Sequence, residues 1–277
     1  MWRSKKNDAE IIRLWAEPGS TISSIAKTLK TTRGTVDGAS RRLGLQFKHD
    51  ASIRILSPNH PAAENGTTTQ PRTLRMPDNN VLKPGGNQRK LGAIVRKGKW
   101  KGFPIYSLTL EERATCPRSC DQWLSCYGNH MGRAIRYRHG PELEAELKRE
   151  VAHLAAKHPL GFVVRLHILG DFYSVPYVVL WSRLLFEHPA LHIFGYTHWK
   201  RGTKIGDAIA TLRDAWWERF AIRTSDAPQD GPHTVVIDHK AKRGDAIICP
   251  AQTMLAKVCG TCSLCWASKK PIAFLKH

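Results

Sequence analysis

The chain has 277 residues, of which 42% are apolar, enough to bury a sizeable core and too many for a wholly disordered protein. Its 43 Lys and Arg outnumber its 23 Asp and Glu, and this net charge of +20 suits a polyanionic partner, either nucleic acid or an acidic membrane surface. No apolar run approaches the ~18 residues of a membrane span, which excludes an integral membrane protein. The first ten residues contain no apolar signal core, so we expect a cytoplasmic protein.

Residues 1–47 are expected to form a three-helix helix-turn-helix domain. Apolar residues at helical spacing predict a helix over 8–16, a second helix capped by Thr21 and a third capped by Thr32. In a helix-turn-helix the third helix lies in the major groove of double-stranded DNA. We therefore expect DNA contacts from Arg33, Thr35, Asp37, Ser40, Arg41 and Arg42, with the last two reaching phosphates. An ordinary three-helix cap with a solvated basic face is the alternative.

A family resemblance supports the DNA-binding interpretation. Residues 32–45 follow the pattern TR-x-x-V-x-G-x-x-x-RLGL, and residues 14–19 read LWAEPG. This region resembles the DNA-binding region of GcrA-type cell-cycle regulators, and the resemblance covers roughly the first 45 residues. It implies DNA binding and transcriptional control, for which RNA polymerase or a sigma factor would be a further partner. The protein could also pair with a second copy of itself to form a homodimer.

The rest of the chain is predicted to be a linker and a larger domain. Residues 48–80 are rich in Pro, Thr and Asn with little periodicity, which predicts a flexible linker. Residues 81–277 alternate strand-like and helix-like runs, which predicts an α/β domain with a mostly parallel sheet. The expected helices are 142–157, 175–186 and 205–217, and the expected strands are 161–169, 191–196, 219–225, 233–238 and 246–249. Parallel sheets bind ligands beyond strand carboxyl ends, which draws attention to residues 170–171 and 196–198.

The strongest chemical signal is a set of four cysteines near residue 260. Cys249-Pro250 is followed by Cys259, Cys262 and Cys265 at C-x₂-C-x₂-C spacing. Bacterial ferredoxins build [4Fe–4S] sites from the same ingredients, so we predict a [4Fe–4S] cluster on these cysteines. One alternative is a zinc ion bound by the same four thiolates. The other is that the four cysteines are buried free thiols that bind nothing.

A second cysteine group consists of Cys116, Cys120 and Cys126, with His130 four residues further on. Three cysteines and a histidine suit a closed zinc site. An aromatic residue after the third cysteine is also similar to radical S-adenosylmethionine enzymes, but those require C-x₃-C-x₂-C, and five residues fill the second gap here. Buried thiols, or completion of the C-terminal site by some of these cysteines, are further possibilities.

Four sequence elements carry a second resemblance. They are TCPRSCDQWLSCYGNHMG, RLHILGDFYSVPYV, FGYTHW and CPAQT…CGTCSLCW…IAFLKH, in this order. The ordered set resembles the phage "gene product 88" family over roughly 190 residues. The resemblance implies a phage or mobile-element protein and a shared fold and site, more than a particular reaction.

Two further segments carry candidate binding residues. Arg165 and His167 alternate along one predicted strand just before Asp171, which predicts a ligand site on one side of the strand. Alternatively, Arg165 and Asp171 pair to anchor the end of the strand. Residues 83–101 contain seven Lys and Arg, no acidic residue and Trp100. This composition predicts DNA-backbone contacts by Lys97 and Lys99, while the Trp100 ring stacks or packs. A solvated edge is the alternative for this segment.

Together these features predict a DNA-binding transcriptional regulator of a phage or mobile element. Its iron–sulfur cluster is expected to stabilise DNA binding or to control it by redox state. One alternative is a radical-SAM-like or other iron–sulfur enzyme acting on nucleic acid, and another is a zinc-stabilised DNA-binding module. No residue is assigned a catalytic role.

Overall fold

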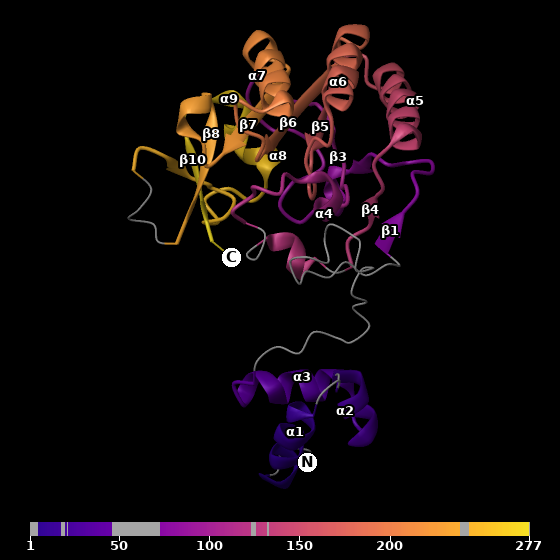
Figure 1. The fold of residues 1–277 in the computed structure, drawn as a ribbon, viewed down its shortest axis with the longest axis vertical. Coiled ribbons are helices and arrows are strands. Elements are labelled where there is room, and N and C mark those ends of the chain that lie inside the picture. Colours follow the sequence, from indigo (N-terminus) through magenta and orange to yellow (C-terminus); the bar gives the residue numbers. More distant parts are fainter. Residues whose placement is uncertain are drawn as a thin grey trace.

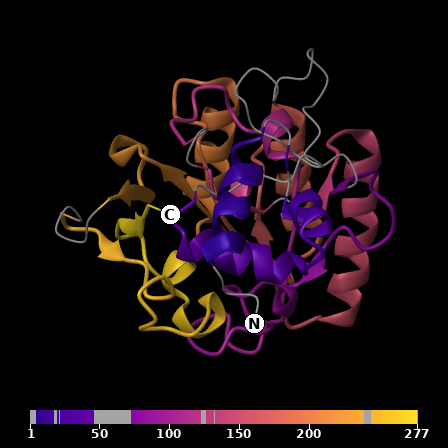
Figure 2. The same ribbon diagram turned by 90° about the horizontal axis from the view of Figure 1, so that it is seen from below.

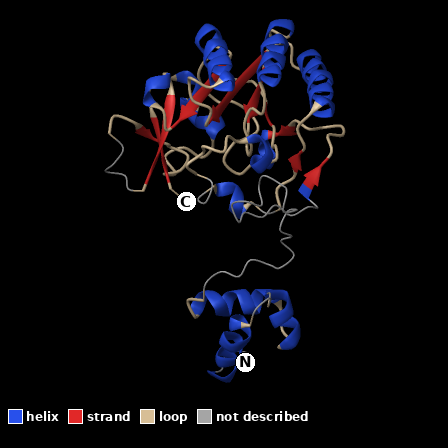
Figure 3. Ribbon diagram, viewed as in Figure 1, coloured by secondary structure: helices blue, strands red, loops and turns tan. Residues whose placement is uncertain are grey.

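The computed structural model describes residues 5–17, 20, 22–45, 73–122, 126–131, 133–238 and 244–276. Within these residues no helix combines the length and the apolar character needed to cross a membrane. Helices and a mostly parallel sheet alternate in the larger part of the chain, which confirms the predicted α/β class (Figure 3).

Three helices make up the N-terminal unit, drawn in indigo in Figures 1 and 2: α1 (Lys5–Ala16), α2 (Ile22–Thr28) and α3 (Arg33–Arg42). They pack around a small apolar core that includes Ile11, Ile25 and Val36. As predicted, the Thr32 side chain caps α3, because its hydroxyl oxygen accepts a hydrogen bond from the backbone N–H of Thr35 at 3.2 Å. Thr21, the predicted cap of α2, lies outside the described residues.

The turn between α2 and α3 has a non-glycine residue in the left-handed region. Lys30 has a φ of +48°, and the backbone N–H of the following Thr31 donates to the carbonyl of Ala26 at 2.9 Å. A side chain in this conformation costs roughly 1 kcal/mol relative to glycine. The turn thus takes a shape that glycine usually provides, although the sequence has lysine there.

Part of the predicted linker belongs to the larger domain. Within the described residues 73–80, β1 (Leu74–Arg75) pairs in parallel with β4 (Arg136–Tyr137), and the side-chain oxygen of Asn79 accepts a hydrogen bond from Arg149 at 2.8 Å. The larger domain therefore begins before residue 81. The rest of the predicted linker, residues 48–72, lies outside the described part of the chain.

An eight-stranded sheet organises the larger domain, with strand order β2-β3-β5-β6-β7-β8-β10-β9. β2 pairs with β3 in antiparallel fashion, and the remaining pairings are parallel. The strands are β2 (Lys83–Pro84), β3 (Ile105–Ser107), β5 (Phe162–Leu166), β6 (Leu191–Thr197), β7 (Phe220–Ser225), β8 (His233–Ile237), β9 (Ile247–Ile248) and β10 (Ile272–Leu275). Parallel neighbours place their carboxyl ends at one edge of the sheet, where ligands of such folds bind.

Helices cover one face of this sheet: α5 (Pro141–Lys157), α6 (Val175–Glu187) and α7 (Lys204–Trp216) (Figures 1 and 3). Alternation along the strands points Val164 and Ile193 toward these helices, where they pack with Trp181. The side chain of Ser174 caps α6 and that of Thr203 caps α7. These helices match the predicted ones to within one residue at each end.

Irregular segments cover the opposite face. Val163 and Phe194 point to this side, and residues 88–104 and 258–267 pack onto them. The rings of Trp100 and Trp266 stack there, with centroids 5.2 Å apart and planes 10° apart. Trp100 is only 2% exposed, so of the two expected roles its ring packs inside the domain and does not stack on nucleic acid. Its apolar area stabilises the domain instead.

Candidate metal centre

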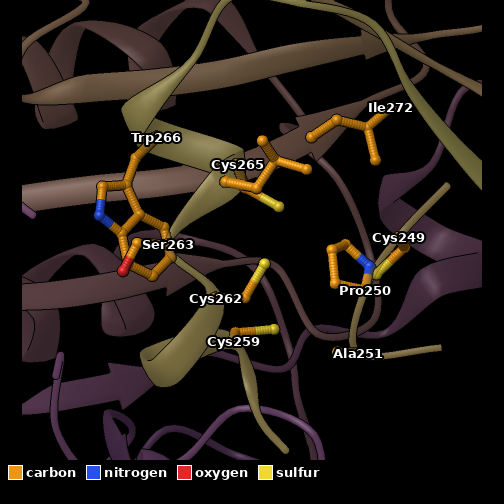
Figure 4. A pocket seen from close by; sticks show the side chains of 10 residues that line it. Cys249, Pro250, Ala251, Cys259, Cys262, Ser263, Cys265, Trp266 and Ile272 are labelled. Carbon is orange, nitrogen blue, oxygen red and sulfur yellow. The ribbon is translucent and has the colours of Figure 1, made fainter. Parts of the chain in front are cut away.

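Four thiols converge on one space on the irregular side of the sheet. Cys249 follows β9, Cys259 and Cys262 lie in α8 (Cys259–Cys262), and Cys265 lies in α9 (Leu264–Ala267). Their sulfur atoms point toward a common pocket that Pro250 and Ile272 also line (Figure 4). The fold therefore brings together the four cysteines that the C-x₂-C-x₂-C spacing and the Cys-Pro pair singled out.

The path of the loop depends on two residues that allow close or unusual backbone geometry. Ser263 has a φ of +61° and joins α8 directly to α9, which turns the chain between Cys262 and Cys265. A Cβ atom at Gly260 would lie 2.3 Å from the carbonyl oxygen of Ile94, so only glycine allows the loop to approach the neighbouring segment.

Burial favours the neutral thiol form of Cys249, Cys259 and Cys265. It raises the pKa of Cys259 to about 12 and that of Cys265 to about 11, and the neighbouring thiols of the group act in the same direction for both. Burial also raises the pKa of Cys249. Thiolates, the form that binds metals, are therefore favoured only when a positively charged group lies between the sulfur atoms.

Positive charge and a hydroxyl group surround the same sulfur atoms. The fully buried side chain of Arg223 donates to the carbonyl oxygens of Cys265 at 3.0 Å and Lys270 at 2.8 Å, and also to that of Ser268. The Tyr196 hydroxyl lies 2.8 Å from the sulfur of Cys265, within hydrogen-bond distance. The guanidinium group of Arg165 lies over the Tyr196 ring, 4.5 Å from its centroid.

Neither arginine has a carboxylate oxygen within ion-pair distance among the described residues. The nitrogen atoms of Arg223 bond to backbone carbonyls, and Arg165 donates to the carbonyl of Leu166. Both positive charges favour an anionic group nearby. The charge of Arg165 lowers the pKa of the Cys259 thiol, and the charge of Arg223 lowers that of the Cys265 thiol, in both cases against the larger effect of burial. Sequence reasoning did not single out Arg223, although an arginine inside the apolar run RFAIRTS was a signal of a buried charge.

The second cysteine group lies after β3. Cys116 follows α4 (Glu112–Thr115), and burial raises the pKa of its thiol, as do the charges of Asp171, Cys120 and Cys126. Burial raises the pKa of Cys120 to about 11 and also raises that of Cys126. Cys116, Cys120 and Cys126 do not line the pocket of the four C-terminal cysteines, so within the described residues the two groups do not share it.

A buried ion pair shapes the loop that carries Cys126. Arg136 binds Glu112 through two hydrogen bonds of 2.7 and 3.0 Å, and the same guanidinium donates to the carbonyl oxygens of Gly128, Met131 and Ala134. Cys126 directly precedes η4 (Tyr127–His130), the short helix that these bonds fix. The side chain of His130, the predicted fourth ligand, lies outside the described residues.

Asp171 links the carboxyl ends of β5 and β6 beside this second group. Its carboxylate accepts hydrogen bonds from the Thr197 hydroxyl and from the backbone N–H groups of Phe172 and His198, each at 2.8 Å. Burial nevertheless raises the pKa of Asp171 to about 7, because desolvation outweighs these bonds. Residues 170–171 and 196–198 thus meet at the edge where the sequence predicted a site.

Arg165 and His167 face opposite sides of the sheet. Arg165 lies on the cysteine side, whereas His167 packs edge-to-face on Phe172 and has Nε2 at 3.1 Å from the Tyr177 hydroxyl, in the helix-covered core. The prediction of one shared face is wrong, because β5 ends at Leu166 and the alternation ends with it. Among the described residues Arg165 and Asp171 form no ion pair either.

The predicted DNA contacts on α3 differ in their accessibility. Arg33 is exposed, and Thr35 and Asp37 are half-buried. Ser40 is 5% exposed and donates to the Asp37 carbonyl, so the prediction that it faces DNA is wrong. Arg42 is exposed, but Asp8 of α1 holds its guanidinium through bonds of 2.7 and 2.8 Å. The side chain of Arg41 lies outside the described residues.

The two lysines predicted to contact DNA also differ. Lys97 is exposed, and Lys99 pairs with Glu218 while lying over the Trp100 ring. A surface ion pair of this kind contributes little and is readily exchanged for another anion.

Within the described residues, no three His, Cys, Asp or Glu side chains form a group that would hold a metal ion. Comparison with protein-family models, with curated proteins and with solved structures found no match to this chain. The metal site and both family resemblances therefore stay predictions.

The buried imidazole of His167 predicts a specific pH dependence of stability. Burial lowers its pKa from 6.5 to about 3, so the unfolded chain binds a proton near pH 6.5 that the folded chain does not. This contribution to stability is complete above pH 6.5 and is lost as the pH falls toward 3. Between roughly pH 6 and 4, the free energy of unfolding should fall by about 1.4 kcal/mol per pH unit more in the wild type than in His167→Gln.

Urea unfolding at several pH values measures this difference. Equal slopes for the wild type and His167→Gln would mean that the folded protein already carries a protonated imidazole.

Proposed function

We propose that this protein is a DNA-binding transcriptional regulator of a phage or mobile element that holds a [4Fe–4S] cluster on Cys249, Cys259, Cys262 and Cys265. The proposal of a cluster is supported by the convergence of four thiols on one space. Beside them lie two arginines, Arg165 and Arg223, that have no carboxylate partner in the described chain. Four thiolates and a cluster carry net negative charge, which Arg165 and Arg223 offset.

The choice of iron–sulfur over zinc rests on the ligand spacing. C-x₂-C-x₂-C with a remote Cys-Pro is the arrangement of bacterial ferredoxins, whereas zinc sites more often use two separate pairs of ligands. A bound cluster would supply a redox-active group and would tie Cys249 to the loop of Cys259, Cys262 and Cys265. Loss or oxidation of the cluster would release that tie and let the loop rearrange.

The DNA-binding part of the proposal rests on the exposed side of α3. Arg33 and two glycines, Gly34 and Gly38, are exposed there, and a Cβ atom at Gly38 would have no neighbour within 4 Å. Residues spaced four apart share a helix face, so the glycines let the α3 backbone approach a groove closely. The net charge of +20 supports attraction to the DNA backbone.

A second candidate function is an iron–sulfur enzyme acting on nucleic acid, of the radical-SAM type or another. The observation that favours it is the place of Cys116, Cys120 and Cys126 beyond the carboxyl end of β3. Cys116 follows Thr115, whose hydroxyl accepts a hydrogen bond from the backbone N–H of Asp171 beyond β5 at 3.1 Å. Enzymes with parallel sheets use this edge for catalysis. Equilibrium binding of S-adenosylmethionine to anaerobically prepared protein, abolished by Cys116→Ser, would favour the enzyme over the regulator.

Metal analysis tests the cluster directly. Anaerobically purified protein is expected to absorb visible light and to contain at least about four iron and four sulfide ions per chain. Cys262→Ser should lose these iron and sulfide ions and melt at a lower temperature, because one ligand of the C-terminal site is missing. Cys120→Ser should keep the C-terminal cluster, since its thiol belongs to the other group. Zinc in place of iron and sulfide would contradict the cluster and support the zinc-stabilised module.

Tyr196 should raise the reduction potential of the cluster. Its hydroxyl lies 2.8 Å from the Cys265 sulfur, and a hydrogen bond to a cluster sulfur stabilises the reduced, more negative state. Tyr196→Phe is therefore expected to shift the midpoint potential to a more negative value in a redox titration followed by visible absorbance. Tyr106→Phe is the matched control, because the Tyr106 hydroxyl contacts His158 at 2.9 Å and no cysteine. Matching potentials for the two variants would remove Tyr196 from this role.

Arg33 should discriminate between DNA sequences. After a preferred site is selected from random DNA, Arg33→Ala is expected to weaken binding to that site by about 1–3 kcal/mol and to weaken random DNA less. Arg13→Ala on α1 is the control, since Arg13 is an exposed arginine of the same unit that pairs with Glu10 and Glu17. Fluorescence anisotropy at fixed salt measures both affinities. An equal loss on both DNAs would make Arg33 a phosphate contact.

A further inference from the structure

Five exposed cations lie on the cysteine loop or on the segment bonded to it. We call them the basic rim: Arg89, Lys90, Arg96, Lys97 and Lys257. Within the described chain none of them pairs with a carboxylate, unlike the neighbouring Lys99, which pairs with Glu218. Clustered cations without internal partners attract a polyanion.

The cysteine loop fixes the backbone of the rim residues. The N–H of Cys259 donates to the carbonyl of Lys90 at 2.8 Å, and the N–H of Arg96 donates to the carbonyl of Gly260 at 2.8 Å. The Ser263 hydroxyl donates to the carbonyl of Lys97 at 3.2 Å. Three of the five rim residues are thus bonded through their own backbone to residues of the loop that carries three of the four cysteines.

The cysteine loop is one of two supports of the rim segment. The other is a turn of the segment itself, in which the N–H of Val95 donates to the carbonyl of Phe103 and the N–H of Gly102 to the carbonyl of Val95, both at 2.9 Å. The described residues 88–104 contain neither a helix nor a named strand, although Ile94 forms an isolated bridge with Pro104. The ring of Trp100 stacks on that of Trp266, the residue after Cys265, and this apolar contact joins the segment to the loop. Through these contacts a change in the loop would be transmitted to the rim.

We propose that the basic rim is a second DNA-contacting surface, which binds the phosphate backbone, and that the cluster holds the rim in its binding shape. This inference rests on the proposed function and specifies how the cluster acts on DNA binding. The cluster would act on affinity through the rim, without any change in α3. DNA is the favoured polyanion because α3 and the rim belong to one chain, and two linked contacts on one molecule raise the effective affinity of both.

Charge reversal on the full-length protein tests the surface. Each phosphate contact contributes about 0.9 to the slope of log affinity against log salt, so Arg96→Glu with Lys97→Glu should make the slope shallower by about two. The matched control is Lys148→Glu with Arg183→Glu, two exposed cations on α5 and α6. The control should keep the wild-type slope. If the rim variant binds DNA with the affinity and salt slope of the control, the basic rim does not contact DNA.

Removal of iron by chelation tests the coupling to the cluster. Iron-free wild type is expected to show the shallow slope of the rim variant, and iron removal should leave the rim variant unchanged. If iron removal made the salt slope shallower by the same amount in the wild type and in the rim variant, the coupling between cluster and rim would be overturned. The basic rim would then still stand as a DNA-contacting surface. Circular dichroism shows whether the iron-free helices persist. If they do not, Ser263→Ala replaces chelation: it keeps all four cysteines, and its slope should become shallower at full iron content.

Two further outcomes are distinguishable. A wild-type protein without iron and sulfide would refute the proposed cluster, and the comparison of the rim variant with its control would still report on the surface. Met254 and Leu255, 90% and 84% exposed beside Lys257, make an acidic membrane the competing partner. Sedimentation with anionic phospholipid vesicles, lost in the rim variant while DNA binding is kept, would overturn the DNA assignment.

Discussion

The buried guanidinium of Arg223 holds the C-terminal cysteine loop to the sheet. The loop has only two helices of four residues each, α8 and α9, so its shape depends on bonds from outside. Arg223 provides them by binding the carbonyl oxygens of Cys265, Ser268 and Lys270 from the middle of β7. A buried charge without compensation costs several kcal/mol. The loop supplies that compensation through its carbonyl dipoles, and thiolates beside the arginine would add to it, so arginine and loop stabilise each other.

The two faces of the sheet follow different physical rules. On the helix side, apolar residues at helical spacing pack on alternating strand positions, and no predicted site residue other than His167 lies in that core. On the other side, irregular segments meet through Trp100 and Trp266, and all four C-terminal thiols gather there. Irregular backbone can wrap around a bound group from several directions, whereas a helix presents one face. The helix-covered face is thus a regular apolar core, whereas the other face carries the four C-terminal thiols on irregular backbone.

Local patterns made much of this arrangement predictable. The helices α5, α6 and α7 follow from apolar periodicity, and the convergence of the cysteines follows from C-x₂-C-x₂-C with Cys-Pro. Contacts between distant segments left no local pattern. Nothing near Trp100 shows that Trp266 will cover it, and the basic character of residues 83–101 hid a segment that packs against the cysteine loop. Alternation failed at His167 because a strand end is set by tertiary contacts. Ser40 was misplaced because exposed and buried positions of a helix follow one another within a single turn, and residues 36, 39 and 40 lie on the buried side of α3.

The order of strands in the sheet sets the order in which the thiols can meet. β10 follows all four cysteines in the chain, yet it lies between β8 and β9. β9 pairs with β10, and the N–H of Cys249 donates to the carbonyl of Ala273 in that strand at 2.8 Å. Cys249 therefore takes its place only after residues 272–275 have been synthesised and inserted. The four cysteines can therefore come together only at the end of synthesis. A ribosome-bound chain whose synthesis has not yet reached β10 cannot place Cys249 beside the other three.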